Sequence, residues 1–178
     1  MITPILENDY ITRSALRNVF SFKSYTAGCR IYEKYRNDTF YNGAISDMNV
    51  IVRYTDGKMI KGVSRDFFPN KDRFIVTPHN ATDGETTEVF TDDLKAVFFV
   101  RDFEGNATYR ERKRFEEDEE GPPLFKVKVT FHDDEVMIGS TMRYDQDRLG
   151  FFLFPVDSNS NNIKTFVVSS AVKRIHFL

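Results

Sequence analysis

Short runs of alternating apolar and polar positions, separated by turn residues, recur along most of the chain. The first clear run is Val50–Tyr54, where three apolar side chains on one face alternate with Ile51 and Arg53 on the other. A period of two residues is the signature of a β-strand. Asp56-Gly57 follows, and this dipeptide is typical of tight hairpin turns because both residues accept the positive φ that such turns require. The pattern predicts a β-hairpin.

The run continues with a long second strand in which Gly62 is placed for a bulge or sharp bend. Five short strands with one bent at a glycine are the ingredients of a small closed barrel, which removes exposed sheet edges. Residues 50–100 therefore predict a first β-barrel. Its strands after the hairpin turn are expected at Met59–Phe67, Arg73–Thr77, Glu88–Phe90 and Ala96–Val100.

The same skeleton recurs in residues 127–178. At a shift of 77 residues, turn acids, glycines, aromatic residues and prolines coincide, and the last two segments coincide at a shift of 78. A shared register over this length predicts a tandem repeat and a second barrel. The matched positions include Val50 and Val127, Gly62 and Gly139, Phe67 and Tyr144, Phe74 and Phe151, Pro78 and Pro155, Lys95 and Lys173, and Phe99 and Phe177. The expected fold is mainly β: two tandem five-stranded small barrels with an N-terminal, partly helical extension.

The order of strand, Asp-Gly turn, bent strand with glycine, third strand and final short pair resembles the Sm-like fold, including bacterial Hfq, and more broadly the SH3-like barrels. This resemblance implies RNA contacts in the turn before the last strand. That turn reads Asp92-Asp93-Leu94 in the first unit and Ser169-Ser170-Ala171 in the second.

A second resemblance covers residues 50–178. The string Leu94–Asn106, the following Tyr109-Arg-Glu and the later Gly150-Phe-Phe-Leu are similar to an uncharacterised bacterial family, a domain of unknown function. This resemblance implies the β fold and no established activity.

Residues 1–49 have a different pattern. Leu16, Phe20 and Ile31 can share one helical face, so a helix is expected somewhere within residues 13–36. Aromatic residues interleave with basic ones here, a combination that can stack on single-stranded nucleic acid. The same composition fits an amphipathic segment that docks on a barrel or a partner.

The linker of residues 101–126 carries a basic run next to an acidic run, Glu116–Glu120. Arg110 and Arg114 have the Arg-x-x-x-Arg spacing that resembles the opening of a PilZ domain, which binds cyclic di-GMP. Guanidinium groups suit phosphate and guanine edges, so these two arginines are the candidate ligand-binding residues. The alternative is a solvated connector whose charges mostly neutralise each other.

Composition narrows the function classes. The net charge is −2, without the basic excess usual for a dedicated nucleic-acid binder. Cys29 is the single cysteine, and His79, His132 and His176 lie far apart, so neither a metal site nor a cofactor is expected. His132 precedes Asp133-Asp134-Glu135 and could contribute to a metal site, but these residues also suit a polar hairpin turn. No segment approaches a membrane span, and the N-terminus lacks the features of a signal peptide, which favours a cytoplasmic protein.

No nucleotide loop, nucleophile elbow or catalytic triad order occurs in the sequence. The sequence therefore predicts a non-enzymatic binding or scaffold protein that acts through protein–protein interaction or self-association. The alternatives are RNA or single-stranded nucleic-acid binding, as in Sm-like proteins, and cyclic di-GMP sensing, as in PilZ domains.

Overall fold

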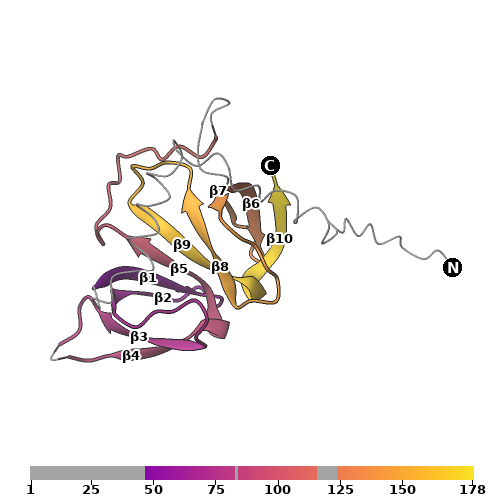
Figure 1. The fold of residues 1–178 in the computed structure, drawn as a ribbon. Coiled ribbons are helices and arrows are strands. Elements are labelled where there is room, and N and C mark those ends of the chain that lie inside the picture. The colour runs from indigo at the N-terminus through magenta and orange to yellow at the C-terminus, as the bar shows by residue number, and fades with distance from the viewer. Residues whose placement is uncertain (1–46, 83, 116–123) are drawn as a thin grey trace, which may run out of the picture.

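The computed structural model describes residues 47–82, 84–115 and 124–178. These residues form a mainly β structure with two short 3-10 helices (Figure 1). The helix expected within residues 13–36 and the acidic run Glu116–Glu120 lie outside the described residues.

Strand bounds in the first half follow the alternation of the sequence. The 3-10 turn η2 (Thr91–Asp93) connects the last two strands. The strands are β1 (Met48–Tyr54), β2 (Met59–Ser64), β3 (Arg73–Pro78), β4 (Thr87–Phe90) and β5 (Leu94–Val100).

The second half has the same succession of elements. Its 3-10 turn η3 (Ser169–Ala171) again precedes the last strand. The strands are β6 (Phe125–Phe131), β7 (Val136–Thr141), β8 (Gly150–Pro155), β9 (Asn162–Val168) and β10 (Val172–Phe177).

Strand β2 is shorter than the sequence predicts, because it ends at Ser64 and not at Phe67. Asp66 lies beyond the end of the strand, and its side chain reaches β3. Its Oδ1 accepts a hydrogen bond from the backbone N–H of Ile75 at 2.9 Å and another from the Ser64 hydroxyl at 3.4 Å. Phe67 is then 8% exposed inside the core. The sequence pattern placed Phe67 at the end of the strand, but Phe67 lies in the loop after β2 and packs into the core.

Gly62 and Gly139 allow two strands to approach closely in each half. Gly62 pairs with Pro78, where β2 meets β3, and Gly139 pairs with Pro155, where β7 meets β8. A Cβ at either glycine would lie 2.3 Å from a backbone carbonyl oxygen of the neighbouring strand. Glycine is therefore required at these two positions because the neighbouring strand lies too close for a Cβ atom.

The ten strands form one sheet in the order β10-β6-β7-β8-β9-β5-β1-β2-β3-β4. All of its pairings are antiparallel. Figure 1 shows β5 and β9 side by side in the middle of the molecule. The prediction of two closed five-stranded barrels is not confirmed, because the described strands form an open sheet. The outer edge of β5 is used for pairing with β9 of the other half, which joins the halves at that edge.

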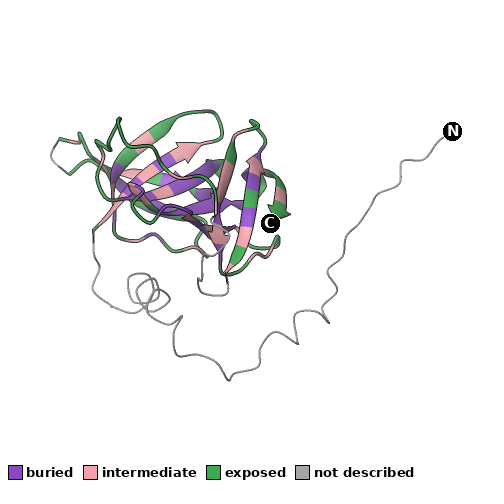
Figure 2. Cartoon of the chain, turned by 90° about the horizontal axis from the view of Figure 1, so that it is seen from above, coloured by how far each residue is buried: buried purple, intermediate pink, exposed green. Residues whose placement is uncertain are grey.

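Two apolar cores lie on the sheet, and β9 contributes to both. Phe166 and Val168 belong to the first core, whereas Val167 belongs to the second. Equivalent ring pairs support each core: Phe67 and Phe74 lie 5.0 Å apart at 82°, and Tyr144 and Phe151 lie 5.2 Å apart at 85°. In Figure 2 the buried residues gather in the central strands, and most exposed ones lie at the rim and in loops.

The described residues contain no helix with the length and apolar character needed to cross a lipid bilayer.

Candidate functional site

The junction between β5 and β9, which we call the seam, is buried along most of its length. Its pairing runs from Ala96 opposite Val167 to Val100 opposite Asn162. Val97 and Phe166, which face each other in this pairing, are both fully buried. The Phe166 ring packs edge-on against Phe67 at 5.2 Å and Phe152 at 5.4 Å. An antiparallel pairing that excludes water in this way is a strong connection between the halves.

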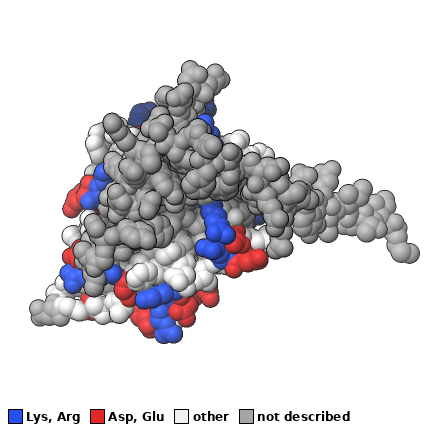
Figure 3. Space-filling model, viewed as in Figure 1, with Lys and Arg blue, Asp and Glu red and all other residues white. Residues whose placement is uncertain are grey.

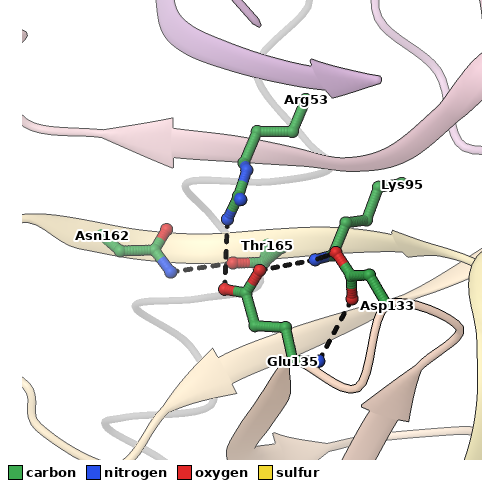
Figure 4. Close-up of polar contacts among 6 residues, drawn as sticks. All are labelled: Arg53, Lys95, Asp133, Glu135, Asn162 and Thr165. Carbon is green, nitrogen blue, oxygen red and sulfur yellow. Dashed lines mark hydrogen bonds and ion pairs between the residues drawn. The ribbon is translucent and has the colours of Figure 1, made fainter. Parts of the chain in front are cut away.

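A cluster of ion pairs closes one end of the seam (Figure 4). The Lys95 ammonium lies 2.5 Å from both Asp133 Oδ2 and Glu135 Oε2, and Arg53 lies 3.1 Å from Glu135 Oε1. Lys95 is only 5% exposed, and its ammonium also lies 4.6 Å from the centre of the Phe131 ring. These contacts tie β1 and β5 of the first half to the turn between β6 and β7.

The charges of this cluster lower the pKa of both carboxyls. The hydrogen bond from Lys95 holds the pKa of Asp133 below its ordinary value. Burial raises the pKa of Glu135, but the hydrogen bonds from Lys95 and Arg53 outweigh it, so that pKa is lowered too. Both carboxylates are thus held charged in the neutral range, which suits a structural ion-pair network.

The turn after His132 therefore carries ion pairs. Asp134 adopts a φ of 63° at the tip of the turn and binds the Lys173 ammonium at 2.6 Å. Within the described residues, no three His, Cys, Asp or Glu side chains come together in a group that could hold a metal ion.

The linker docks on both halves. At the first half, the Phe103 carbonyl accepts a hydrogen bond from Lys61 at 2.9 Å, and the Phe103 ring lies 4.7 Å from that of His79. At the second half, Asp157 accepts hydrogen bonds from the Tyr109 hydroxyl at 2.6 Å and the Arg112 backbone N–H at 3.0 Å. These bonds lower the pKa of Asp157, with the Arg112 N–H the largest cause.

A groove of about 220 Å³ lies between linker residues 111–113 and the start of β7 at residues 136–138, and Glu135 and Thr165 also line it. Typical small-molecule pockets measure roughly 300–1,000 Å³ and are mostly apolar. This groove is smaller and carries charged groups of both signs. It does not have the form of a small-molecule site.

Arg110 and Arg114 are exposed, and neither lines the groove. Arg112, which lies between them, lines the groove and donates a hydrogen bond to the Val156 carbonyl at 3.1 Å. The described linker, residues 101–115, has no helix. In a chain that is not helical, the Arg-x-x-x-Arg spacing does not by itself put both guanidinium groups on one face.

The turns implied by the Sm-like resemblance are η2 and η3. Asp92 and Asp93 are exposed in η2, and Ser170 is exposed in η3. On the face seen in Figure 3, lysines and arginines lie beside aspartates and glutamates. The residues of η2 and η3 include no lysine or arginine that could contact the phosphates of RNA.

The outer strands of the described sheet, β4 and β10, each have one side that is not paired with another described strand. Among the described residues, β4 pairs only with β3 and β10 pairs only with β6. The Thr91 N–H points back to Asp72 O at 2.7 Å, and the Leu178 N–H points back to Lys126 O at 2.9 Å. Successive N–H groups of a strand point to opposite sides, so the preceding N–H groups, of Phe90 and of Phe177, point outward.

Sequence reasoning missed the seam, the Lys95 cluster and both edges. The alignment of Lys95 with Lys173 was visible, but nothing in the sequence showed that Lys95 is buried among carboxylates of the other half. The aligned pair Phe99 and Phe177 gave no signal either, because the two residues are identical in sequence, whereas in the structure Phe99 is 4% exposed at the seam and Phe177 is 43% exposed at the edge.

These features define a mainly β protein, and in its described residues an open sheet is joined across a buried seam and has β4 and β10 as its outer strands. Residues 46–178 match the model of a Family of unknown function (DUF6982), and the chain belongs to that family. No curated protein and no solved structure matches the chain.

Proposed function

We propose that this protein is a non-enzymatic scaffold that binds protein partners by adding their strands to its sheet edges. The observation that carries the proposal is the pair of edges β4 and β10, each with one side unpaired in the described part of the chain. An exposed strand edge presents a row of backbone donors and acceptors that a partner strand satisfies directly.

Side chains at the edges support binding. Phe90 on β4 and Phe177 on β10 are each 43% exposed, and Leu178 next to β10 is 61% exposed. Aromatic residues that are partly exposed beside unpaired backbone groups add apolar area to a strand pairing. Each edge therefore offers both hydrogen bonds and an apolar contact.

The two halves act in this proposal as tandem copies of one Sm-like or SH3-like unit. Val50 pairs with Gly62 and Phe99 in the first half, and Val127 pairs with Gly139 and Phe177 in the second. A unit whose fourth and fifth strands both offer an edge can join other strands in series, and the seam is one such junction.

The proposal is tested by immobilising this protein and its variants and measuring which partner proteins each one retains. Glu88→Pro and Ile175→Pro each remove a backbone N–H that points away from the neighbouring strand, at positions where an edge strand tolerates proline. Glu88→Gln and Ile175→Val are the matched controls, since they change the side chain and keep the N–H.

The expected result is a protein, a further copy of this chain included, that wild type and both controls retain and that at least one proline variant releases. Cross-links from that protein should map to β4 or β10. Equal capture by all five proteins, or capture by none, contradicts the proposal.

A further inference from the structure

The seam shows which strands of this chain pair across units. It joins the last strand of the first half, β5, to the fourth strand of the second half, β9. The corresponding strands of the opposite halves are β10 and β4, and these are the two edge strands. The molecule thus carries one used junction and the two separate parts of a second junction of the same kind.

The seam also predicts a register for that second junction. Val97 pairs with Phe166 in the seam, and the positions 78 residues away are Ile175 on β10 and Glu88 on β4. By the alternation that starts from Leu178 and Thr91, the N–H groups of Ile175 and Glu88 both point outward. Placed opposite each other, these two residues would exchange both backbone hydrogen bonds.

The two edges carry opposite charge. Residues 84–93, which contain β4, hold four acidic residues and no lysine or arginine, and all four acids are exposed. Residues 172–178, which contain β10, hold exposed Lys173, Arg174 and His176 and no acid. Two copies of β4, or two copies of β10, would place like charges together, whereas β4 against β10 places opposite charges together.

The exposed apolar residues at the edges match buried ones at the seam. Phe177 and Leu178 correspond to Phe99 and Val100, which are 4% and 7% exposed. Phe90 corresponds to Val168, which is 1% exposed. A strand paired at each edge would cover the three edge residues as the seam covers their counterparts.

We infer that the partner of these edges is a second copy of this chain, joined head to tail with β10 of one copy against β4 of the next. The inference rests on the proposed function, because it names the occupant of the same edges. A junction between two different surfaces is heterologous, so each added copy presents a new edge, and the assembly continues as a ring or a filament.

Mixing two half-blocked variants tests the head-to-tail arrangement. Ile175→Pro blocks β10 and leaves β4 available, whereas Glu88→Pro blocks β4 and leaves β10 available. In light scattering after size exclusion, wild type should show a mass that grows with concentration, and each variant alone should have the mass of one chain. An equimolar mixture should give a species of two chains and nothing larger.

Formation of that two-chain species also shows that both proline variants are folded at their remaining edge. Ile175→Val and Glu88→Gln should associate as wild type does. If both variants stay monomeric when mixed although wild type associates, or if either variant alone still forms oligomers, the inference is overturned.

A variant that associates more tightly than wild type provides a further test, because a misfolded variant would lose association and not gain it. In the seam, Asp133 and Glu135 hold Lys95, and the residues at the corresponding positions are Asp56, Lys58 and Lys173. Lys58 therefore places a like charge where the seam has a carboxylate, and its side chain is 80% exposed. Lys58→Glu should tighten association by about fivefold, the upper range for one exposed pair.

Lys128→Glu is the matched control, because it changes the charge equally on β6, a strand with partners on both sides. Added salt should weaken the wild-type association and reduce the difference between wild type and Lys58→Glu. An equal or larger gain from Lys128→Glu would contradict the predicted contact and overturn the inference.

Failure of this inference is distinguishable from failure of the proposed function. Purified wild type that remains a single chain up to about 1 mM overturns the inference. If immobilised wild type then still retains another protein that Glu88→Pro or Ile175→Pro releases, the scaffold function stands. If it retains none, both proposals fail.

Discussion

Within the part of the chain that the structure describes, the seam and the two sheet edges place strands with aligned sequences in different environments. At the seam, Val97 and Phe166 are fully buried against each other, and Lys95 is enclosed by carboxylates. At the edges, the corresponding positions hold Ile175, the exposed Glu88 and the exposed Lys173. The difference lies mainly at one position, where the seam has the buried Phe166 and the edge has the exposed Glu88, so the seam excludes water and a strand paired at the edge would be held more weakly.

The largest effect should come from removing the central ring of the seam. Phe166→Ala empties a site that is 0% exposed and packed against Phe67 and Phe152, so we expect a loss of roughly 3–5 kcal/mol in the free energy of unfolding. Urea denaturation followed by circular dichroism measures it. The edge counterpart Glu88→Ala should change stability by less than about 0.5 kcal/mol. Equal losses would mean that seam and edge do not differ as described.

A smaller loss is expected where β8 approaches the seam strand. A Cβ on Gly150 would lie 2.3 Å from Val167 O and 2.6 Å from the Phe166 ring, so Gly150→Ala should cost roughly 1–3 kcal/mol by overpacking. The position 77 residues earlier is Arg73, which pairs with Phe90 beside the free edge and is more than half exposed. Arg73→Ala should change stability little in the same urea denaturation experiment, and a loss comparable with that of Gly150→Ala would contradict the comparison.

The next largest effect should be a difference in stability loss between substitutions of the aligned residues Lys95 and Lys173. Lys95→Met removes the ammonium that binds Asp133 and Glu135, and the exposure of those carboxylates limits the loss to about 1–2 kcal/mol. Lys173→Met at the edge breaks one exposed pair with Asp134 and should cost less than about 1 kcal/mol. Guanidinium chloride would screen these charges, so urea titration is the suitable measurement.

The smallest effect concerns pH. The pKa values of Asp133 and Glu135 are lowered in the folded protein, so their contribution is present above the unfolded carboxyl range near pH 4 and is lost as pH falls through the folded values. The stability difference between wild type and Lys95→Met should therefore shrink from pH 6 toward pH 3. A difference that grows on acidification would show that these carboxylates are not held charged by Lys95.

The sequence predicted several strands and the first hairpin turn well. Alternation located β1, β3 and β5 to within a few residues, and Asp56-Gly57 marked the first hairpin turn, where Gly57 has a φ of 90°. The sequence predicted a bulge or bend at Gly62, whereas the structure shows that glycine is needed there because β3 lies close. The strands and the turn depend on neighbours close in sequence, so local patterns report them directly.

The partner of β5 could not be predicted in this way. A strand that pairs within its own half and a strand that pairs with the other half have the same period of two. The position of the candidate ligand-binding residues Arg110 and Arg114 could not be predicted either, because the spacing of residues in a non-helical linker does not determine which side chains face the protein.

By itself, the sequence determined the mainly β character, the aligned positions of residues 50–100 and 127–178, and the first hairpin turn at Asp56-Gly57. Only the tertiary structure decided that β5 pairs with β9, that Lys95 is buried among acids of the other half, and that β4 and β10 are the outer strands among the described residues. The physical reason is that side-chain patterns describe the faces of a strand, whereas its edges present backbone groups that every residue but proline supplies alike.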